Sequence, residues 1–422
     1  MFREFFRMDK EAHTSITTLH EWGEDIFPKL SWFKRDKVKQ ARVMVVGCGA
    51  LGNEVLKNLA LFGVGHLVLV DFDRVEYSNL TRSVLFRQED ATLNRPKVEA
   101  AARSLHELNP DVSLLPLQAD ICWQVGLGLI RRMDVVVGCL DNRMARYVLN
   151  RLCMRAGVPW VDGGISGLDG VAKVFIPGRN CYACTLEPEA LKELSRGISC
   201  ASMVRRDERA ERVATTPVVA SIIGAVQAQE AMKLIHQEEM ERGELTSLCG
   251  KMFCYEGQHL TSRMVLHQGW DEDCPMHACW NPVLTSDCTT QMSVGIVLDR
   301  LAEMLQVDSV EIVLRNHSWV DVVEVRNSGK IYEVMRPDKE VPAFIEQHPD
   351  LCFIPLSGIY QHEYRTIGYD FPNKQLTLQE IGIPDGDVLH VRTTSGDSYV
   401  ELLLRQRDLN LLGYSEYDGS NE

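Results

Sequence analysis

The sequence predicts an α/β protein whose mostly parallel sheet carries helices on both faces, followed by a smaller α+β region. Between residues 41 and 167, short β-branched runs alternate with segments whose apolar residues recur at helical spacing. Beyond residue 291 this alternation stops, and one amphipathic segment precedes several short strand-like runs separated by turns. The alternation favours a parallel sheet, because parallel neighbours need a crossover connection, usually a helix.

The first strand, helix and strand form one βαβ unit. VMVVG, residues 43–47, is a short β-branched run of the kind that forms buried parallel strands. GCGALG follows as a tight turn, and NEVLKNLALFG has apolar residues at helical spacing and ends at Gly63. HLVLVDFD, residues 66–73, is the second strand and ends in acidic residues.

Further elements continue this pattern. They are a helix over 97–109, strands over 112–120 and 133–141, a helix over 143–157, a strand and loop over 159–167, and a helix over 216–236. The last helix is apolar nearly all round, which predicts burial against the sheet or in a subunit interface. We divide the chain into a helical lead-in over 1–34, an α/β domain over 35–285 with a crossover segment over 185–215, an α+β domain over 290–410, and a tail over 411–422.

The composition is that of a soluble globular protein. The 422 residues are 45% hydrophobic and 25% charged, and no run of about 18 apolar residues is present to span a membrane. The N-terminus lacks the apolar core of a secretory signal, so we expect a cytoplasmic protein whose thirteen cysteines are thiols, metal ligands or nucleophiles. The net charge of −14 argues against nonspecific nucleic-acid binding, which needs a basic surface. The charge weakly favours a basic protein partner, and a role in keeping the protein soluble explains it at least as well.

A glycine turn indicates a nucleotide site. Gly47, Gly49 and Gly52 form G-x-G-x-x-G between a predicted strand and helix, where backbone N–H groups and the helix N-terminus attract phosphate. Asp71 ends the next strand, where a carboxylate can accept hydrogen bonds from ribose hydroxyls. Taken alone, this fingerprint also fits an NAD-dependent dehydrogenase.

Polar residues after the second strand favour a triphosphate over a dinucleotide. Asn79, Arg82 and Lys97 supply an amide and two cations, which suit three phosphates. Asp141 follows another strand and is a candidate ligand for Mg²⁺. The alternative for any one of these residues is a helix cap or a solvated surface charge.

In order and spacing these motifs resemble the adenylation domain of the ubiquitin-activating enzyme superfamily, including its ThiF- and MoeB-like activators of sulfur carriers. The matching motifs are the glycine turn, D-x-D-x-V-x-x-S-N-L-x-R, R-P-K and L-D-N-x-x-x-R, within residues 35–285. The resemblance implies binding of ATP and Mg²⁺ by Gly47, Gly49, Gly52, Asp71, Asp73, Asn79, Arg82, Lys97, Asp141 and Asn142. It implies that ATP is joined to the C-terminal carboxylate of a small β-grasp protein, with catalytic roles for Arg82, Lys97 and Asp141.

The sequence departs from that family before the first strand. Relatives often carry an arginine there, in an R-Y-x-R-Q context, that reaches the site of a neighbouring subunit. Here the segment is FPKLSWFKRDKVKQ, in which Arg35 or Lys34 could substitute, without a firm assignment. The resemblance implies a homodimer or a heterodimer with a second adenylation-fold subunit.

Two cysteine pairs predict a structural zinc site. Cys181 and Cys184 form C-x-x-C, a two-thiolate clip that commonly binds zinc. A second clip contains Cys274 and Cys279, with His277 between them. We favour four thiolates, with His277 as the alternative to Cys279 and ordinary buried thiols as the alternative to zinc.

Cys200 is the candidate nucleophile. It lies in GISCASMVRRDE beyond the first clip, and its context resembles activating enzymes in which one cysteine accepts the modifier as a thioester. Arg205 and Arg206 nearby would favour the thiolate. The polar crossover segment with Gly197 suggests a mobile catalytic loop, and an unreactive loop thiol is the alternative.

The C-terminal region separates the possible functions. A helix over 293–307 and strands over 310–316, 320–326 and 330–335 precede TLQEIGIPDGDVLHVRTTSGDSYVELLLR, which holds a turn and two more strands. This tail resembles the β-grasp ubiquitin-fold domain of the NEDD8-activating type, which implies docking of a conjugating enzyme. We therefore expect an activating enzyme for a ubiquitin-like protein. The alternatives are a sulfur-carrier adenylyltransferase, a dinucleotide-dependent redox enzyme and a non-catalytic subunit.

Overall fold

The structure, a computed structural model, describes residues 27–199, 214–267, 269–355 and 358–414. Most of the expected lead-in over 1–34 lies outside these residues. The described part of that segment contains a short 3-10 helix over Phe27–Lys29, and helix α1 (Arg35–Gln40) follows it.

One eight-stranded sheet forms the first part of the molecule, in the order β3-β2-β1-β4-β5-β6-β7-β8. Its strands are β1 (Arg42–Val46), β2 (His66–Val70), β3 (Ser113–Leu117), β4 (Val135–Gly138), β5 (Trp160–Ser166), β6 (Asp169–Phe175), β7 (Lys251–Glu256) and β8 (Thr261–Leu266). The pairs from β3 to β5 are parallel, which confirms the Rossmann-like prediction, and β6 to β8 add an antiparallel extension. Because β2 and β4 flank β1, the strand order reverses beside β1, where ligands of such sheets bind.

Helices cover both faces of this sheet, as predicted. Val43 and Val45 of β1 pack on one face against α2 (Ala50–Phe62), α4 (Lys97–Leu108) and α8 (Pro217–Ile235). Met44 and Val46 alternate to the other face, against α5 (Leu127–Arg131) and α6 (Arg143–Ala156). Both faces of the strand are buried, which explains why its sequence is a continuous apolar run.

Helix α8 is a core helix of the sheet domain. By length and composition it could cross a membrane, but 56% of that apolar window is buried inside the protein. It packs against α2 so closely that a Cβ on Gly224 would lie 2.7 Å from the Cβ of Glu54. Residues of α8 join the apolar cluster on this face of the sheet, and burial against the sheet was one of the two predicted outcomes.

Further helices connect these strands. They are α3 (Gln88–Thr92), α7 (Pro188–Ser199) and α9 (Gln237–Glu241). Gly197 lies inside α7, so the structure has a helix where the sequence suggested a hinge. Cys200, Arg205 and Arg206 lie outside the described residues.

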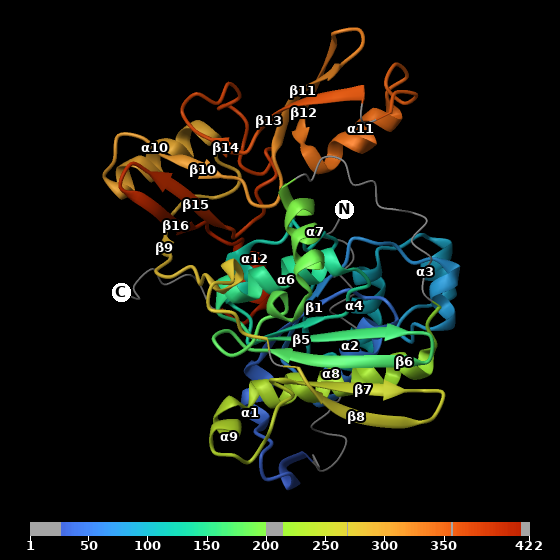
Figure 1. Cartoon of the computed structure of the whole chain (residues 1–422). Helices are drawn as coiled ribbons and strands as arrows, with labels where there is room; N and C mark the ends of the chain where they lie inside the picture. Colours follow the sequence, from blue (N-terminus) through green and yellow to red (C-terminus); the bar gives the residue numbers. More distant parts are fainter. Residues whose placement is uncertain (1–26, 200–213, 268, 356–357, 415–422) are drawn as a thin grey trace, which may run out of the picture.

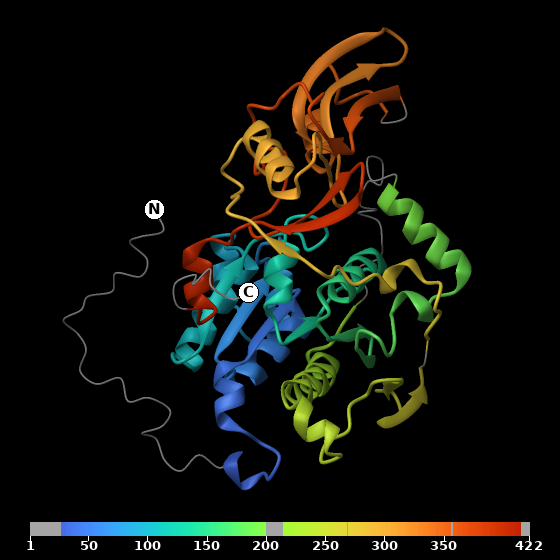
Figure 2. The same cartoon turned by 90° about the vertical axis from the view of Figure 1, so that its left-hand side faces the viewer.

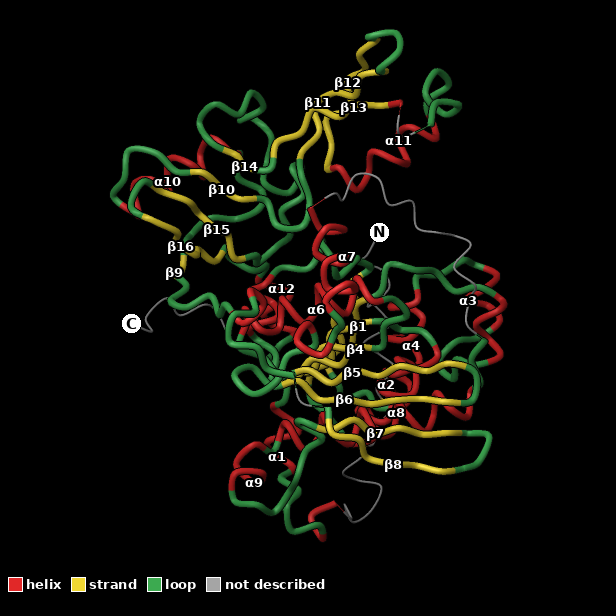
Figure 3. Tube along the Cα trace, viewed as in Figure 1, coloured by secondary structure: helices red, strands yellow, loops and turns green. Residues whose placement is uncertain are grey.

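The C-terminal region is α+β, as predicted, and lies above the large sheet in Figure 1. A five-stranded sheet has the order β14-β10-β15-β16-β9, and a three-stranded sheet has the order β12-β11-β13 (Figure 3). The elements are β9 (Leu284–Thr285), α10 (Val294–Leu305), β10 (Glu311–Val313), β11 (Trp319–Val325), β12 (Lys330–Pro337), α11 (Val341–Gln347), β13 (Ile359–Tyr364), β14 (Thr366–Ile367), β15 (Val388–Thr393), β16 (Gly396–Glu401) and α12 (Gln406–Leu411). In these sheets only the β16–β9 pair is parallel among the described strands, so the ubiquitin-like fold stays a prediction.

The C-terminal region returns to the α/β domain through α12. The carbonyl oxygen of Leu411 lies 2.8 Å from Nδ1 of His66, and Ser113 Oγ donates to the same oxygen at 2.6 Å. Figure 2 shows this red helix beside the blue and cyan first part of the chain. Leu412 is buried in the same apolar cluster as β1 and β2, so the expected tail over 411–422 begins within the fold.

Candidate functional site

The glycine turn lies at the carboxyl end of β1, where backbone atoms pack at close range. Gly47 has φ +95°, and a Cβ there would lie 2.3 Å from the carbonyl oxygen of Cys139 after β4. A Cβ on Gly52 would lie 1.9 Å from the carbonyl oxygen of Gly47. By contrast, open space lies where a Cβ on Gly49 would be, at the N-cap of α2. Two of the glycines are therefore required by the fold, whereas the third leaves room for a ligand.

Asp71 holds the glycine turn in place. Its Oδ2 accepts a hydrogen bond from the N–H of Cys48 at 2.7 Å, and its Oδ1 accepts one from the N–H of Asp73 at 2.8 Å. Burial raises the pKa of Asp71, and the nearby ammonium group of Lys97 opposes that rise. Each carboxylate oxygen has a second lone pair, so the side chain can still accept a hydrogen bond from a ribose hydroxyl.

Lys97 lies at the start of α4, next to the chain that follows β2. Its backbone N–H donates to the carbonyl oxygen of Asp73 at 3.0 Å, which fixes the R-P-K segment against that chain. Its Nζ lies 2.9 Å from Oδ2 of Asp73, and the lysine side chain is 12% exposed. Burial alone would lower the pKa of Lys97, but the carboxylates of Asp71 and Asp73 outweigh burial and raise it. A charged amine therefore lies beside the glycine turn.

Asp141 follows β4, the strand on the other side of β1. Its carboxylate is exposed and accepts a hydrogen bond from the amide of Asn142 at 3.1 Å. The carbonyl side of Asn142 caps α6 by accepting from the N–H of Ala145 at 2.7 Å. The glycine turn, Asp71 and Asp141 thus follow three adjacent strands and gather at one edge of the sheet. Carboxylate and amide oxygens at such an edge fit Mg²⁺.

Asn79 and Arg82 form hydrogen bonds within the turn that follows β2. Asn79 is buried, and its Oδ1 accepts from the N–H of Glu76 at 3.0 Å. Arg82 Nη1 donates to the carbonyl oxygen of Ser78 at 2.8 Å. In this structure both side chains shape the segment after β2, and phosphate binding by either stays a prediction.

Three buried polar residues that support the site were missed. Asn53 Nδ2 donates to the carbonyl oxygens of Cys48 and Gly49, at 2.7 and 2.9 Å, which ties the glycine turn to α2. Gln227 of α8 donates to the carbonyl oxygen of Gly138 at 2.9 Å, at the end of β4. Asp162 of β5 pairs with an arginine of α6. An amide or acid amid apolar residues is the sequence signal that could have identified them.

That arginine is Arg146, which lies in the quoted L-D-N-x-x-x-R motif. Its Nε donates to Oδ1 of Asp162 at 2.9 Å, and its Nη2 donates to the carbonyl oxygens of Leu140 and Gly163 at 2.6 and 2.9 Å. Leu140 directly precedes Asp141. The guanidinium group therefore fixes the backbone that carries the candidate magnesium ligand.

Arg35 and Lys34, the two residues that could substitute for that arginine, both donate hydrogen bonds within this chain. Arg35 Nη1 donates to the carbonyl oxygen of Phe62 at 2.7 Å, and its guanidinium group lies 5.0 Å from the ring centre of Phe33. Lys34 Nζ donates to the carbonyl oxygen of Ser31 at 3.0 Å. Arg35 is thus bound at the C-terminal end of α2, and the structure does not support its transfer to another site.

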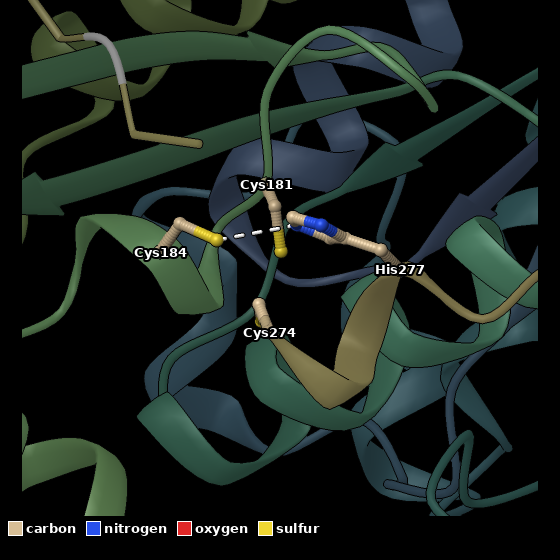
Figure 4. A group of neighbouring side chains, drawn as sticks. All are labelled: Cys181, Cys184, Cys274 and His277. Atoms are coloured by element: carbon tan, nitrogen blue, oxygen red, sulfur yellow. Dashed lines mark hydrogen bonds between the residues drawn. The ribbon is translucent and has the colours of Figure 1, made fainter. Parts of the chain in front are cut away.

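Four side chains gather in a candidate metal site (Figure 4). Cys181, Cys184, Cys274 and His277 place their ligand atoms within 4.8 Å of one another. The Cys184 Sγ and His277 Nε2 atoms are 3.2 Å apart. Ligand atoms around a tetrahedral Zn²⁺ lie roughly 3.5–4 Å apart, so three thiols and an imidazole here fit zinc.

Cys279, the fourth ligand favoured from the sequence, lies outside this group. Its side chain is exposed, and its Sγ donates to the carbonyl oxygen of Arg155 at 3.6 Å. His277 takes the place instead, because Cys274 and His277 flank one 3-10 turn (Pro275–His277), in which residues three apart lie on the same side. The chain is extended after this turn, and Cys279 leaves the group.

The surroundings of the group suit bound thiolates. Asn150 Nδ2 donates to Cys181 Sγ at 3.2 Å, as outer hydrogen bonds to metal ligands commonly do. The Trp270 ring stacks on His277, with centres 3.7 Å apart. Burial lowers the pKa of His277, which keeps the imidazole neutral, whereas burial and neighbouring thiols raise the pKa of Cys184. A divalent cation would favour the thiolate form.

The comparisons with known proteins match the part of the chain that contains the glycine turn, Asp71 and Asp141. A family model described as the ThiF family matches residues 16–276, beginning inside the expected lead-in. The SAMP-activating enzyme E1 of Haloferax volcanii is 36% identical over 240 residues, 57% of this chain and 81% of that protein. The sulfur carrier protein ThiS adenylyltransferase of Escherichia coli is 35% identical over 219 residues, 51% of this chain and 81% of that protein. The adenylyltransferase and sulfurtransferase MOCS3 of Sus scrofa is 35% identical over 345 residues, 81% of this chain and 70% of that protein.

Proposed function

Because this chain belongs to the ThiF family, an adenylyltransferase family, we propose that it uses ATP to activate the C-terminal carboxylate of a ubiquitin-like protein. One observation carries the proposal. Lys97, the Asp71 carboxylate and the glycine turn meet where the strand order reverses, and Asp141 follows the adjacent strand. The names of the relatives favour adenylation over dinucleotide redox chemistry.

The reaction is an in-line displacement at phosphorus. A carboxylate oxygen of the partner attacks the α-phosphate of ATP, the bond to the β-phosphate breaks, and pyrophosphate leaves with the electron pair. N–H groups of the turn near Gly49 hold the phosphates, and Asp71 accepts from the ribose. Lys97 exchanges Asp73 for a phosphate oxygen and stabilises the charge that develops there. Mg²⁺ held by Asp141 and Asn142 would neutralise phosphate charge.

We propose a structural role for zinc. The ion would be held by Cys181, Cys184, Cys274 and His277. Four protein ligands complete a tetrahedral site and leave no position for a catalytic water. The group joins the segment after β6 to the segment that leads into the C-terminal region. The site would therefore fix the start of α7 and of the crossover that carries Cys200.

Pyrophosphate exchange tests the first step. Labelled pyrophosphate should enter ATP only when a small β-grasp protein is added, and Lys97→Ala should lower this exchange about 100-fold or more. Lys330→Ala is the matched control, since Lys330 lies in an exposed ion pair with Asp350 far along the chain. Exchange that survives Lys97→Ala unchanged, or a protein that binds NAD and ignores ATP, would remove the proposal.

Two continuations of this step are open. In the first, the Cys200 thiolate attacks the adenylate carbonyl, AMP leaves, and a conjugating enzyme takes the modifier from the thioester. In the second, the protein is a sulfur-carrier adenylyltransferase, as the names of two relatives suggest, and Cys200 is incidental or serves persulfide transfer. A DTT-sensitive adduct that disappears in Cys200→Ala, while exchange persists, would establish the first. Exchange without any adduct would favour the second.

The three-stranded sheet of the C-terminal region has one face with exposed apolar side chains. Ile331, Glu324 and Tyr360 form one row across β12, β11 and β13, and the Ile331 and Tyr360 side chains are more than half exposed. On the opposite face, Val320, Val323 and Ile359 pack against α11 and form the core of this unit. We propose that this row contacts the conjugating enzyme, and that the active assembly is a homodimer or heterodimer in the cytoplasm.

A further inference from the structure

A cavity of about 370 Å³ lies between α6 of the α/β domain and the C-terminal sheets. Its volume is in the range of small-molecule sites. Arg151 and Arg155 come from α6, and Arg315 comes from the segment after β10. Five arginines but only two carboxylates line the cavity. The other two arginines are Arg365 and Arg392, and the carboxylates are those of Asp338 and Glu363.

Buried N–H groups in this cavity lack hydrogen-bond acceptors. Arg315 is 7% exposed, and its Nη2 donates to Asp387 Oδ1 and to the carbonyl oxygen of Val125, at 2.8 and 2.9 Å. Its Nε and Nη1 are buried without a partner in the described part of the chain. The same holds for Nε of Arg151, whose Nη2 donates to the amide oxygen of Asn316. Unsatisfied buried donors are costly, so these groups indicate a missing acceptor.

The charges in the cavity do not balance. Three of the arginines have carboxylate partners: Arg315 with Asp387, Arg365 with Glu363, and Arg392 with Glu311. Arg151 and Arg155 have none within ion-pair distance among the residues that the structure describes. Arg155 instead lies over the Trp280 ring, 4.3 Å from its centre. Two positive charges therefore remain uncompensated next to each other.

The cavity is an unfavourable environment for the charges of Arg151 and Arg155. Burial, together with Arg315, lowers the pKa of Arg151 to about 10. Burial, together with Arg151 and Arg315, lowers the pKa of Arg155 to about 9. The guanidinium groups stay charged at neutral pH, so their repulsion opposes folding until an anion enters.

We propose that this cavity binds a phosphoryl dianion, either free or carried by a small metabolite. Two uncompensated guanidinium groups match the two charges of a phosphate monoester, and their planar N–H pairs suit its oxygens. The cavity differs from the nucleotide site, because Arg151 and Arg155 lie about 12 and 18 Å along α6 from its N-terminus. A bound dianion would bridge α6 to Arg315 and so fasten the C-terminal region to the α/β domain.

The test is anion titration of the full chain by calorimetry and thermal unfolding. Inorganic phosphate and glycerol 3-phosphate are compared with chloride at equal ionic strength. The double variant Arg151→Gln/Arg155→Met removes both uncompensated charges, and Arg407→Gln changes an exposed arginine outside the cavity. Lys97→Ala separates the cavity from the nucleotide site.

Phosphate should bind and raise the unfolding temperature of the unaltered chain and of Arg407→Gln and Lys97→Ala. The double variant should bind at least about 100-fold more weakly, yet unfold at a higher temperature without anion, because the repulsion is gone. Tighter binding of glycerol 3-phosphate would identify a metabolite, and equal binding would identify free phosphate. No response beyond that of chloride, an equal response in the double variant, or loss of the response in Lys97→Ala would overturn the proposal. Arg155→Lys, which keeps the charge, should bind with intermediate strength.

Discussion

Replacing Arg146 with glutamine should destabilise the α/β domain strongly. Arg146 and Asp162 are 15% and 4% exposed, so the value for buried pairs applies rather than the much smaller one for surface pairs. Glutamine removes the positive charge and the three hydrogen bonds that Arg146 donates, to one carboxylate and two backbone oxygens, and leaves a buried carboxylate uncompensated. We expect a loss of about 3–5 kcal/mol in the free energy of unfolding. That is a large share of the 5–15 kcal/mol typical of a folded protein.

The pH dependence of this loss has a definite sign. Burial raises the pKa of Asp162 in the folded protein, and Arg146 opposes that rise. Without Arg146 the folded pKa rises further, so the folded state binds more protons than the unfolded state above about pH 4. The stability of Arg146→Gln therefore falls as the pH rises towards the folded pKa. The difference in the free energy of unfolding between the unaltered protein and Arg146→Gln should therefore be smaller at pH 5 than at pH 7.

Urea unfolding followed by intrinsic fluorescence measures this effect. Asp162→Asn in the Arg146→Gln background should recover about 1–3 kcal/mol of the loss, because it removes the uncompensated charge. Lys330→Gln, in an exposed ion pair, is the control and should leave the urea midpoint unchanged. A loss below about 1 kcal/mol, no recovery in the double variant, or a deficit that does not vary with pH would refute the reasoning.

Three further predictions concern separate sites. His277→Ala should lose zinc during dialysis against a chelator, whereas Cys279→Ser should retain one zinc per chain by elemental analysis; the reverse result would restore Cys279 as the ligand. Gly49→Ala should keep its unfolding temperature and weaken ATP binding at least about tenfold, because the new methyl group fills only ligand space. Gly52→Ala should lower both the unfolding temperature and the affinity for ATP, because its Cβ would lie 1.9 Å from a backbone oxygen. Equal unfolding temperatures of Gly49→Ala and Gly52→Ala would contradict this difference. Ile331→Asp should slow transfer to a conjugating enzyme without changing pyrophosphate exchange; unchanged transfer would exclude this surface.

The local sequence pattern was sufficient to predict the parallel part of the α/β domain and much of its candidate site. β-branched runs and helical spacing are properties of neighbouring residues, so the strands β1 to β5 and the helices α2, α4 and α6 could be predicted, whereas the five-residue helices α3 and α5 were not. The carboxyl ends of parallel strands lie at one edge of a sheet, so the sequence alone places Gly47, Asp71 and Asp141 close together. The antiparallel strands β6 to β8 were not predicted, because the pairing of β6 with β7 joins residues 79 to 85 positions apart.

The sequence by itself determined the parallel part of the sheet, the edge that gathers the nucleotide residues and the presence of a thiol cluster. Tertiary structure alone decided that His277 rather than Cys279 completes that cluster, and that Arg35 is bound inside its own subunit. It alone brought Arg151 and Arg315, which are far apart in the chain, to one cavity. The physical reason is the same in each case. Periodicity fixes which face of an element is apolar, whereas the partner that a polar side chain meets depends on how distant elements pack.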